Sequence, residues 1–329
     1  MLILTQHTCN EWAHSTGLVH AFFGLGNFAV PFFFACSGFL FFSKYNSLDS
    51  RDQKAYYKKW SIRIGKMYLV WSLIYFVFVF NSWFCDGFIW AKPLNWLHRA
   101  LVFSTYATIW FLPALWLGIS LCCLMKKYLS YKATLITVFL LFSIGNLFGS
   151  YDNILIKSPE VESFYDWYMK IFITWRNGVF NGAPYVFIGM YIASKKLDGH
   201  RYYTDILFTI VFCLAFLAEA FCITRFKLGH ATDMGFFLAP AIYFMMKSLI
   251  ETHIKPCQTC ILCRNLSMLV FLGQRLFLSA IPAVWHSMAG WIDSLPQAMI
   301  YVYFVSITLL FSIVVERLSI RYKFLKILW

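Results

Sequence analysis

The sequence is poor in charge. Only 13% of its 329 residues are Asp, Glu, Lys or Arg, while 60% are hydrophobic. Soluble domains contain about 25% charged residues, so this balance excludes an ordinary soluble globule. With 36 Phe, 19 Tyr and 13 Trp, the chain is suited to lipid contact and to the aromatic belts of membrane interfaces.

Several other features are missing. The sequence has no internal repeat, no low-complexity segment and no signal peptide with a small-residue cleavage site. Its ten cysteines show no disulfide framework. Five of them lie within apolar runs, where a free cysteine behaves as a small hydrophobic residue: Cys36, Cys122, Cys123, Cys213 and Cys222. We therefore expect a single membrane-embedded domain over residues 1–329.

Apolar runs predict an all-α integral membrane protein of about ten transmembrane helices, because a helix needs about 20 apolar residues to cross a bilayer. The predicted spans are 1–12, 22–42, 64–83, 106–125, 133–150, 178–194, 203–223, 234–250, 266–288 and 298–315. The first is too short to cross alone. We interpret it as a truncated helix whose natural start lies upstream of Met1.

The positions of the cations predict the orientation. If the N-terminus is cytoplasmic, 21 of the 28 Lys and Arg residues fall on cytoplasmic segments. This bias predicts that both termini are cytoplasmic. Because the net charge of +13 is divided among short loops beside the membrane, it also argues against nucleic acid as a partner.

The strongest local charge follows the second predicted span. A run of Phe residues breaks at Ser37-Gly38 and leads into a predicted loop with seven cations: Lys44, Arg51, Lys54, Lys58, Lys59, Arg63 and Lys66. Such a loop predicts an anionic ligand at the membrane surface. The alternative is a topology signal only.

Histidines and an arginine within or beside the spans are candidates for chemistry. His7 lies in an apolar run and His286 late in the ninth span. An ionisable group there usually faces the protein interior, and histidine exchanges protons near neutral pH. Arg176 precedes the sixth span, where it either holds an anion or reaches to the interface. The alternative for the histidines is an interfacial position.

Other motifs have structural alternatives. Small residues such as Ser37-Gly38 either pack helices together or let a ligand pass, and Trp110 suits an interfacial belt. The loop 151–176 mixes carboxylates with aromatic residues, which suits either a sugar or a solvated interface. The run Cys257, Cys260, Cys263 has the spacing of zinc or iron–sulfur ligands, but it lacks a fourth cysteine, and we expect no metal.

The order of these motifs resembles the acyltransferase-3 family of bacterial membrane acyltransferases. The matching stretches are LILTQHT with His7, VPFFFACSGFLFF with Ser37, YYKKWSIRIGKMYLVWSLIY and IWFLPALWL with Trp110, and more weakly PYVFIGMYIASKK and SAIPAVWH. Three features depart from the family pattern. The basic residue about ten positions before the histidine is absent, Trp60 replaces one of two arginines, and Ala283 replaces a tyrosine.

The resemblance implies a multi-pass protein of the bacterial inner membrane that moves an acyl group, usually acetyl, from cytoplasmic acyl-CoA to a hydroxyl of a surface glycan or glycolipid. It implies that Lys58, Lys59 and Arg63 bind the CoA phosphates. His7 then acts as general base or as acyl acceptor, and Ser37 positions the acyl chain or its oxyanion.

The sugar is expected to approach past Trp110, Arg176 and His286, and acyl-CoA is a donor substrate in this scheme. The alternatives are a transporter or flippase for a lipid-linked glycan, and an inactive relative.

Overall fold

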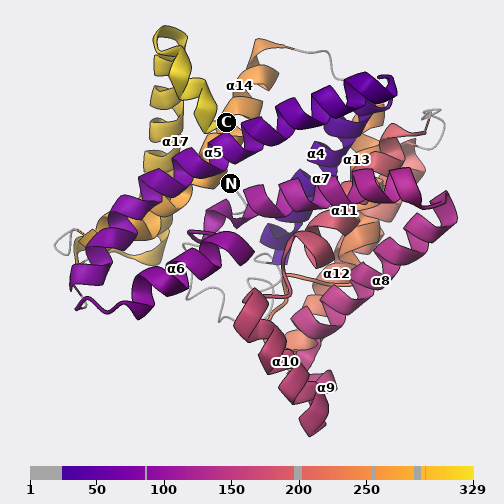
Figure 1. Cartoon of the computed structure of the whole chain (residues 1–329), viewed down its shortest axis with the longest axis horizontal. Coiled ribbons are helices and arrows are strands. Elements are labelled where there is room, and N and C mark those ends of the chain that lie inside the picture. Colours follow the sequence, from indigo (N-terminus) through magenta and orange to yellow (C-terminus); the bar gives the residue numbers. More distant parts are fainter. Residues whose placement is uncertain (1–23, 86, 196–201, 253–256, 285–289, 293) are drawn as a thin grey trace. The chain divides into compact units, whose positions relative to one another are not determined.

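The computed structural model describes residues 24–85, 87–195, 202–252, 257–284, 290–292 and 294–329. These residues form helices joined by turns, with no strand among them (Figure 1). In chain order the helices are η1 (Leu25–Phe28), α4 (Ala29–Tyr45), α5 (Ser50–Cys85), α6 (Ala91–Val102), η2 (Thr108–Trp110), α7 (Phe111–Tyr128), α8 (Tyr131–Ser150), α9 (Asp152–Leu155), α10 (Pro159–Phe172), η3 (Gly178–Gly182), α11 (Ala183–Ala193), α12 (Tyr202–Arg225), α13 (Leu238–Glu251), α14 (Gln258–Arg275), η4 (Leu276–Ala280), α15 (Ile281–Val284), α17 (Gln297–Arg321) and η5 (Lys323–Leu328). The all-α prediction is confirmed.

Within the described residues, seven helices are long and apolar enough to cross a membrane. They are Leu25–Tyr45, Ser50–Cys85, Thr108–Tyr128, Tyr131–Ser150, Tyr202–Arg225, Gln258–Ala280 and Met299–Arg321. They correspond to the second, third, fourth, fifth, seventh, ninth and tenth predicted spans. The sixth predicted span forms a shorter apolar helix, Gly178–Ala193, and the eighth forms α13, which has 14 residues. The first predicted span lies outside the described residues.

The exposed surface of α12 supports the membrane assignment. Leu207, Ile210 and Leu214 are all exposed and follow one another at intervals of three and four residues. This spacing places them on one face of the helix. A continuous apolar face of this kind is stable in lipid, and the chain is accordingly a multi-pass membrane protein.

The helices gather into two compact units. The first contains the last two thirds of α5 with α6, η2, α14, η4, α15, α17 and η5. The second contains η1, α4, the first third of α5, most of α7, and α8 to α13. In the first unit, Trp71 Nε1 donates to the backbone oxygen of Leu328 at 3.0 Å, and the Tyr75 hydroxyl donates to that of Leu272 at 2.6 Å. These bonds hold η5 and α14 against α5.

Glycines bring α4 and α11 close together in the second unit. A Cβ atom at Gly189 would lie 2.1 Å from the Ala35 oxygen, and one at Gly38 would lie 2.4 Å from the Val186 oxygen. Neither position has room for a side chain. The helix α4 continues through Ser37-Gly38 without a break, and the small residues there serve close helix packing, which is the structural alternative for this motif.

The predicted basic loop is wrong for six of its seven cations, because α5 begins at Ser50 and carries them all except Lys44. Asp49 accepts a hydrogen bond from the Asp52 backbone N–H at 2.9 Å, as an N-terminal cap does. Gln53 Nε2 donates to the backbone oxygens of Tyr45 and Leu48 at 3.1 and 2.9 Å, which fixes the turn. The cations thus lie on a rigid helix.

Candidate functional site

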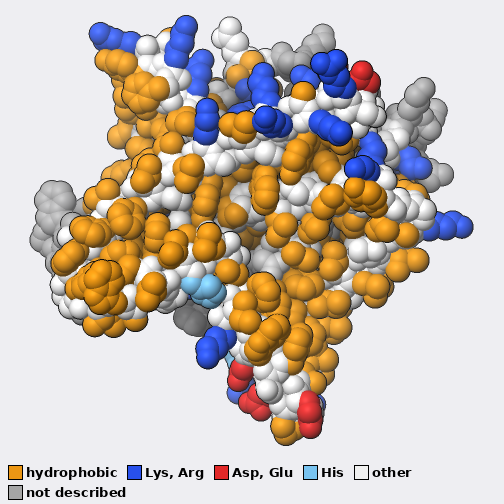
Figure 2. Space-filling model, in the orientation of Figure 1, with side chains coloured by type: hydrophobic (Ala, Val, Ile, Leu, Met, Phe, Trp, Pro, Cys, Tyr) orange, Lys and Arg blue, Asp and Glu red, His pale blue; other side chains and the backbone are white. Residues whose placement is uncertain are grey.

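The two ends of the second unit differ in charge. The 20 residues of α8 separate them by about 30 Å at 1.5 Å per residue. One end, which we call the basic end, contains the last turn of α4, the start of α5 and the end of α7. The other, the carboxylate end, contains α9, α10 and the segment 226–237. In Figure 2, orange side chains cover the helices of this unit between the Lys and Arg over the start of α5 and the Asp and Glu on α9 and α10.

Aromatic rings surround Phe41 at the basic end. The ring centroids of Tyr45, Tyr56 and Trp60 lie 5.4, 5.2 and 5.1 Å from that of Phe41. Phe41 itself is buried. The other three rings are half-buried.

Cations lie over these rings. Lys44 Nζ is 5.4 Å from the centroid of Tyr56, and Lys126 Nζ is 5.4 Å from that of Tyr45. Lys126 also donates to the Asn46 side chain. Both distances are within the range of cation–π attraction. The basic end therefore combines positive charge with partly open aromatic faces.

The three predicted phosphate-binding residues all lie on α5 with exposed side chains. Lys58 and Lys59 belong to the second unit and Arg63 to the first. Within the described residues, neither lysine forms an ion pair with a carboxylate. Arg63 Nη2 donates to the backbone oxygen of Trp329 at 3.1 Å.

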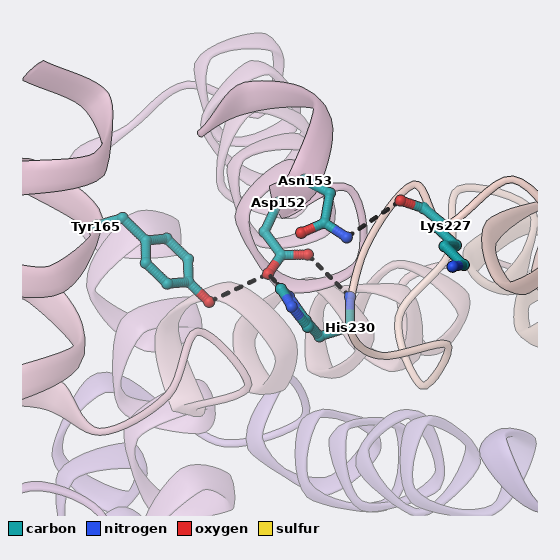
Figure 3. Close-up of polar contacts among 5 residues, drawn as sticks. All are labelled: Asp152, Asn153, Tyr165, Lys227 and His230. Atoms are coloured by element: carbon teal, nitrogen blue, oxygen red, sulfur yellow. Dashed lines mark hydrogen bonds and ion pairs between the residues drawn. The ribbon is translucent and has the colours of Figure 1, made fainter. Parts of the chain in front are cut away.

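A buried aspartate organises the carboxylate end (Figure 3). The Asp152 side chain is only 3% exposed. Its Oδ1 accepts the backbone N–H of His230 at 3.0 Å, and its Oδ2 lies 2.6 Å from His230 Nδ1 and 3.4 Å from the Tyr165 hydroxyl. Burial and the Asp152 carboxylate raise the pKa of Tyr165, so this hydroxyl remains a donor.

His230 is the exposed member of this group. Its side chain is 75% exposed, although its backbone is fixed. Gly229 allows that placement, because a Cβ atom there would lie 2.1 Å from the Ser150 oxygen. With Nδ1 held against the carboxylate, the other ring nitrogen is the one open to a ligand. Asn153 adds a bond to the same segment, since its Nδ2 donates to the Lys227 oxygen at 3.1 Å.

A second buried carboxylate fixes the other end of the segment. Glu219 accepts the Tyr151 hydroxyl at 2.6 Å and the backbone N–H groups of Phe236 and Phe237 at 2.7 and 3.0 Å. These N–H groups immediately precede α13. Arg176, predicted to bind substrate, forms an ion pair with Asp233 of the same segment. The segment 226–237 is therefore held at several points.

The loop predicted over 151–176 is instead mainly helical. Pro159 begins α10, and Ser158 caps it by accepting the Val161 N–H at 3.3 Å. Trp175 and Tyr168 are buried against each other, with ring centroids 3.7 Å apart. These two rings stabilise the protein and are not open to a sugar, whereas Trp167 is exposed.

Two of the remaining predicted site residues are among the described residues. Trp110 is buried in the first unit and stacks on Phe103 at 6.0 Å, and Ser37 is half-buried in α4. His7 and His286 lie outside the described residues. The sequence reasoning noticed Asp152 but missed His230. A histidine directly after Gly229, just beyond a span, was the signal present, but its partner is 78 residues away.

The fold and the two ends define a multi-pass membrane protein with a cationic, aromatic surface at one end and a carboxylate-held segment at the other. The family described as an acyltransferase domain matches residues 1–317. The chain belongs to this family, acyltransferase-3. The predicted resemblance is confirmed.

Three relatives carry racemase names. Two amino-acid racemases of Enterococcus faecalis are 25% identical over 224 residues, covering 68% of this chain and 30% of the relative, and 26% identical over 281 residues, covering 83% and 38%. A serine/alanine racemase of Enterococcus gallinarum is 24% identical over 229 residues, covering 68% and 32%. The chain spans about a third of the length of these curated relatives. No solved structure matches it.

Proposed function

We propose that this chain transfers an acyl group, most simply acetyl, from cytoplasmic acyl-CoA to a hydroxyl of a surface or lipid-linked glycan in the bacterial inner membrane. The observation that carries the proposal is the cationic, aromatic end of a unit whose family transfers acyl groups. We place the basic end and both termini on the cytoplasmic side of the membrane.

The donor meets the basic end. Acyl-CoA carries a pyrophosphate and a 3′-phosphate, and Lys58, Lys59 and Arg63 supply charge-assisted hydrogen bonds to them. The partly open rings of Tyr45 and Tyr56 offer stacking surfaces to the adenine base. These rings lie under Lys44 and Lys126, so the same surface carries both cations and aromatic faces.

The chemistry is assigned to His7. It takes the proton of the acceptor hydroxyl while the hydroxyl oxygen bonds to the acyl carbon and the C–S bond to CoA breaks. Alternatively, it accepts the acyl group first and passes it to the hydroxyl. In both routes CoA leaves as the thiol, and Ser37 positions the acyl chain.

The acceptor approaches from the carboxylate end. At this end Arg176 is a proposed acceptor residue, and the open ring nitrogen of His230 adds a fixed hydrogen-bonding group for a sugar hydroxyl. Trp110 of the first unit and His286 also remain proposed acceptor residues. The ion pair with Asp233 orients Arg176 toward the same segment. No metal takes part in this scheme.

The racemase names do not bring racemisation to this chain, because it covers only 30–38% of those relatives. The rival is a flippase for a lipid-linked glycan, and it differs in consuming no acyl-CoA. An inactive relative is the third reading.

The deciding measurement is mass spectrometry of the host's surface glycans with and without the gene. We expect deletion to remove acetyl groups, wild type to restore them and His7→Ala to leave them absent, although the variant still inserts. Unchanged acetylation together with accumulation of a lipid-linked precursor would favour the flippase instead.

A further inference from the structure

Two cysteines face each other at the start of α14. Cys257 is the N-cap residue of this helix, and its Sγ accepts the Cys260 backbone N–H at 3.3 Å. The Sγ atoms of Cys257 and Cys260 are 3.0 Å apart. Both side chains are exposed, so the pair is accessible to small molecules in solution.

A metal site is the alternative role for these cysteines. Within the described residues, no three His, Cys, Asp or Glu side chains are placed to hold a metal ion. Cys263, the third cysteine of the run, is exposed one turn further along α14. The pair therefore has the arrangement of a dithiol.

Cys257 is also activated. Its hydrogen bonds with the Cys260 thiol and backbone N–H lower its pKa, and a helix N-terminus favours a negative charge. Because the thiolate is the nucleophile in thiol chemistry, Cys257 is the attacking group and Cys260 the group that closes the bond. Cys85 is exposed, and within the described part of the chain it forms no hydrogen bond with another thiol, so it provides an internal comparison.

We propose that Cys257 and Cys260 form a redox-active dithiol that exchanges with small-molecule disulfides. The Cys257 thiolate attacks a glutathione disulfide and releases one reduced glutathione. Cys260 then attacks the mixed disulfide, loses its proton to water and releases the second. The pair is oxidised by two electrons while the glutathione disulfide is reduced.

Only a small movement is needed to close the bond, because a disulfide requires an S–S distance of about 2.05 Å. Oxidation also removes the Cys257 thiolate that accepts the Cys260 N–H, so the first turn of α14 loses its N-cap acceptor. The proposal concerns a surface of the first unit and does not rest on the acyl-transfer chemistry.

The test uses membranes that contain the full chain, equilibrated over a range of reduced-to-oxidised glutathione ratios and then alkylated. Peptide mass spectrometry should find a Cys257–Cys260 disulfide that lacks two hydrogens and takes up no alkylating reagent, while Cys85 and Cys263 remain alkylated. Before oxidation, Cys257 should react with iodoacetamide severalfold faster than Cys85, and its reaction should persist to lower pH.

Single variants distinguish a redox dithiol from a zinc site and from unreactive thiols. Cys260→Ser should trap Cys257 as a stable glutathione adduct, and Cys263→Ser should change nothing. The proposal is overturned if Cys257 and Cys260 stay reduced and alkylate at the rate of Cys85. It is equally overturned if wild type holds zinc that Cys263→Ser loses.

Discussion

The basic end and the carboxylate end of the second unit treat charge in opposite ways. At the basic end, Lys58 and Lys59 extend from a helix without a carboxylate partner among the described residues. At the carboxylate end, Asp152 and Glu219 are buried and accept three hydrogen bonds each. The cations of the basic end are exposed to a ligand, whereas the carboxylates of the other end bind groups of their own chain.

Burial is the cause of this difference, since a buried charge must be paired while an exposed one is hydrated. Lys247 shows the same rule beside the basic end. It is 15% exposed, and its Nζ lies 2.8 Å from Asp205 of α12. Substitutions at the carboxylate end should therefore change stability, and substitutions at the exposed basic end should change ligand binding.

The largest effect is expected from Glu219→Ala, which leaves the Tyr151 hydroxyl and two backbone N–H groups without their acceptor. Each unsatisfied buried donor costs about 1–3 kcal/mol, so we expect a loss of roughly 4 kcal/mol in the free energy of unfolding. Thermal unfolding in detergent, followed by size-exclusion chromatography, measures it. Glu219→Gln keeps one acceptor oxygen and should lose less. Equal stability of all three proteins would contradict the role of Glu219.

A smaller loss is expected from Gly229→Ala, because its Cβ atom would overlap the Ser150 oxygen. Forcing such an overlap costs about 1–3 kcal/mol. Gly65→Ala is the matched control, since a Cβ atom there has nothing within 4 Å and alanine favours a helix. The same thermal assay should rank Gly65→Ala at or above wild type, and a reversed order would mean that the segment is not held as described.

The smallest effect on stability, and the clearest effect on binding, is expected from the double variant Lys58→Ala/Lys59→Ala. Loss of charge-assisted contacts worth about 1.4 kcal/mol raises the KM for acetyl-CoA about tenfold. Its unfolding should match wild type. The double variant Lys157→Ala/Lys170→Ala, at two exposed positions of the opposite end, controls for the loss of two charges. A KM that changes equally in both variants would remove the basic end from the donor site.

The sequence located most of the membrane helices because their apolar length is a local property. It also located the cations beside the second span, but it predicted a loop where the structure has the start of α5. Only a few residues mark the starts of α5 and α10: the turn after Tyr45 and the caps at Asp49 and Ser158. Most of the stability of a helix comes from its contacts with the rest of the fold, which the sequence does not display.

The candidate site was predicted only in part. Lys58, Lys59 and Arg63 are exposed on α5, and their role in donor binding stays a prediction. His230 was missed because its significance depends on a carboxylate 78 residues away, and Trp175 and Tyr168 were misjudged because stacking between them removes both from solvent.

The sequence by itself determined that this chain is helical, lies in a membrane and belongs to a family that moves acyl groups. Composition, apolar length and motif order are properties of the linear sequence and do not depend on contacts between distant residues. The tertiary structure decided which charges are buried and paired, which remain open, and where backbones meet at Gly38, Gly189 and Gly229. Those outcomes depend on which distant residues share a small volume, since it is the loss of water there that forces a polar group to find a partner.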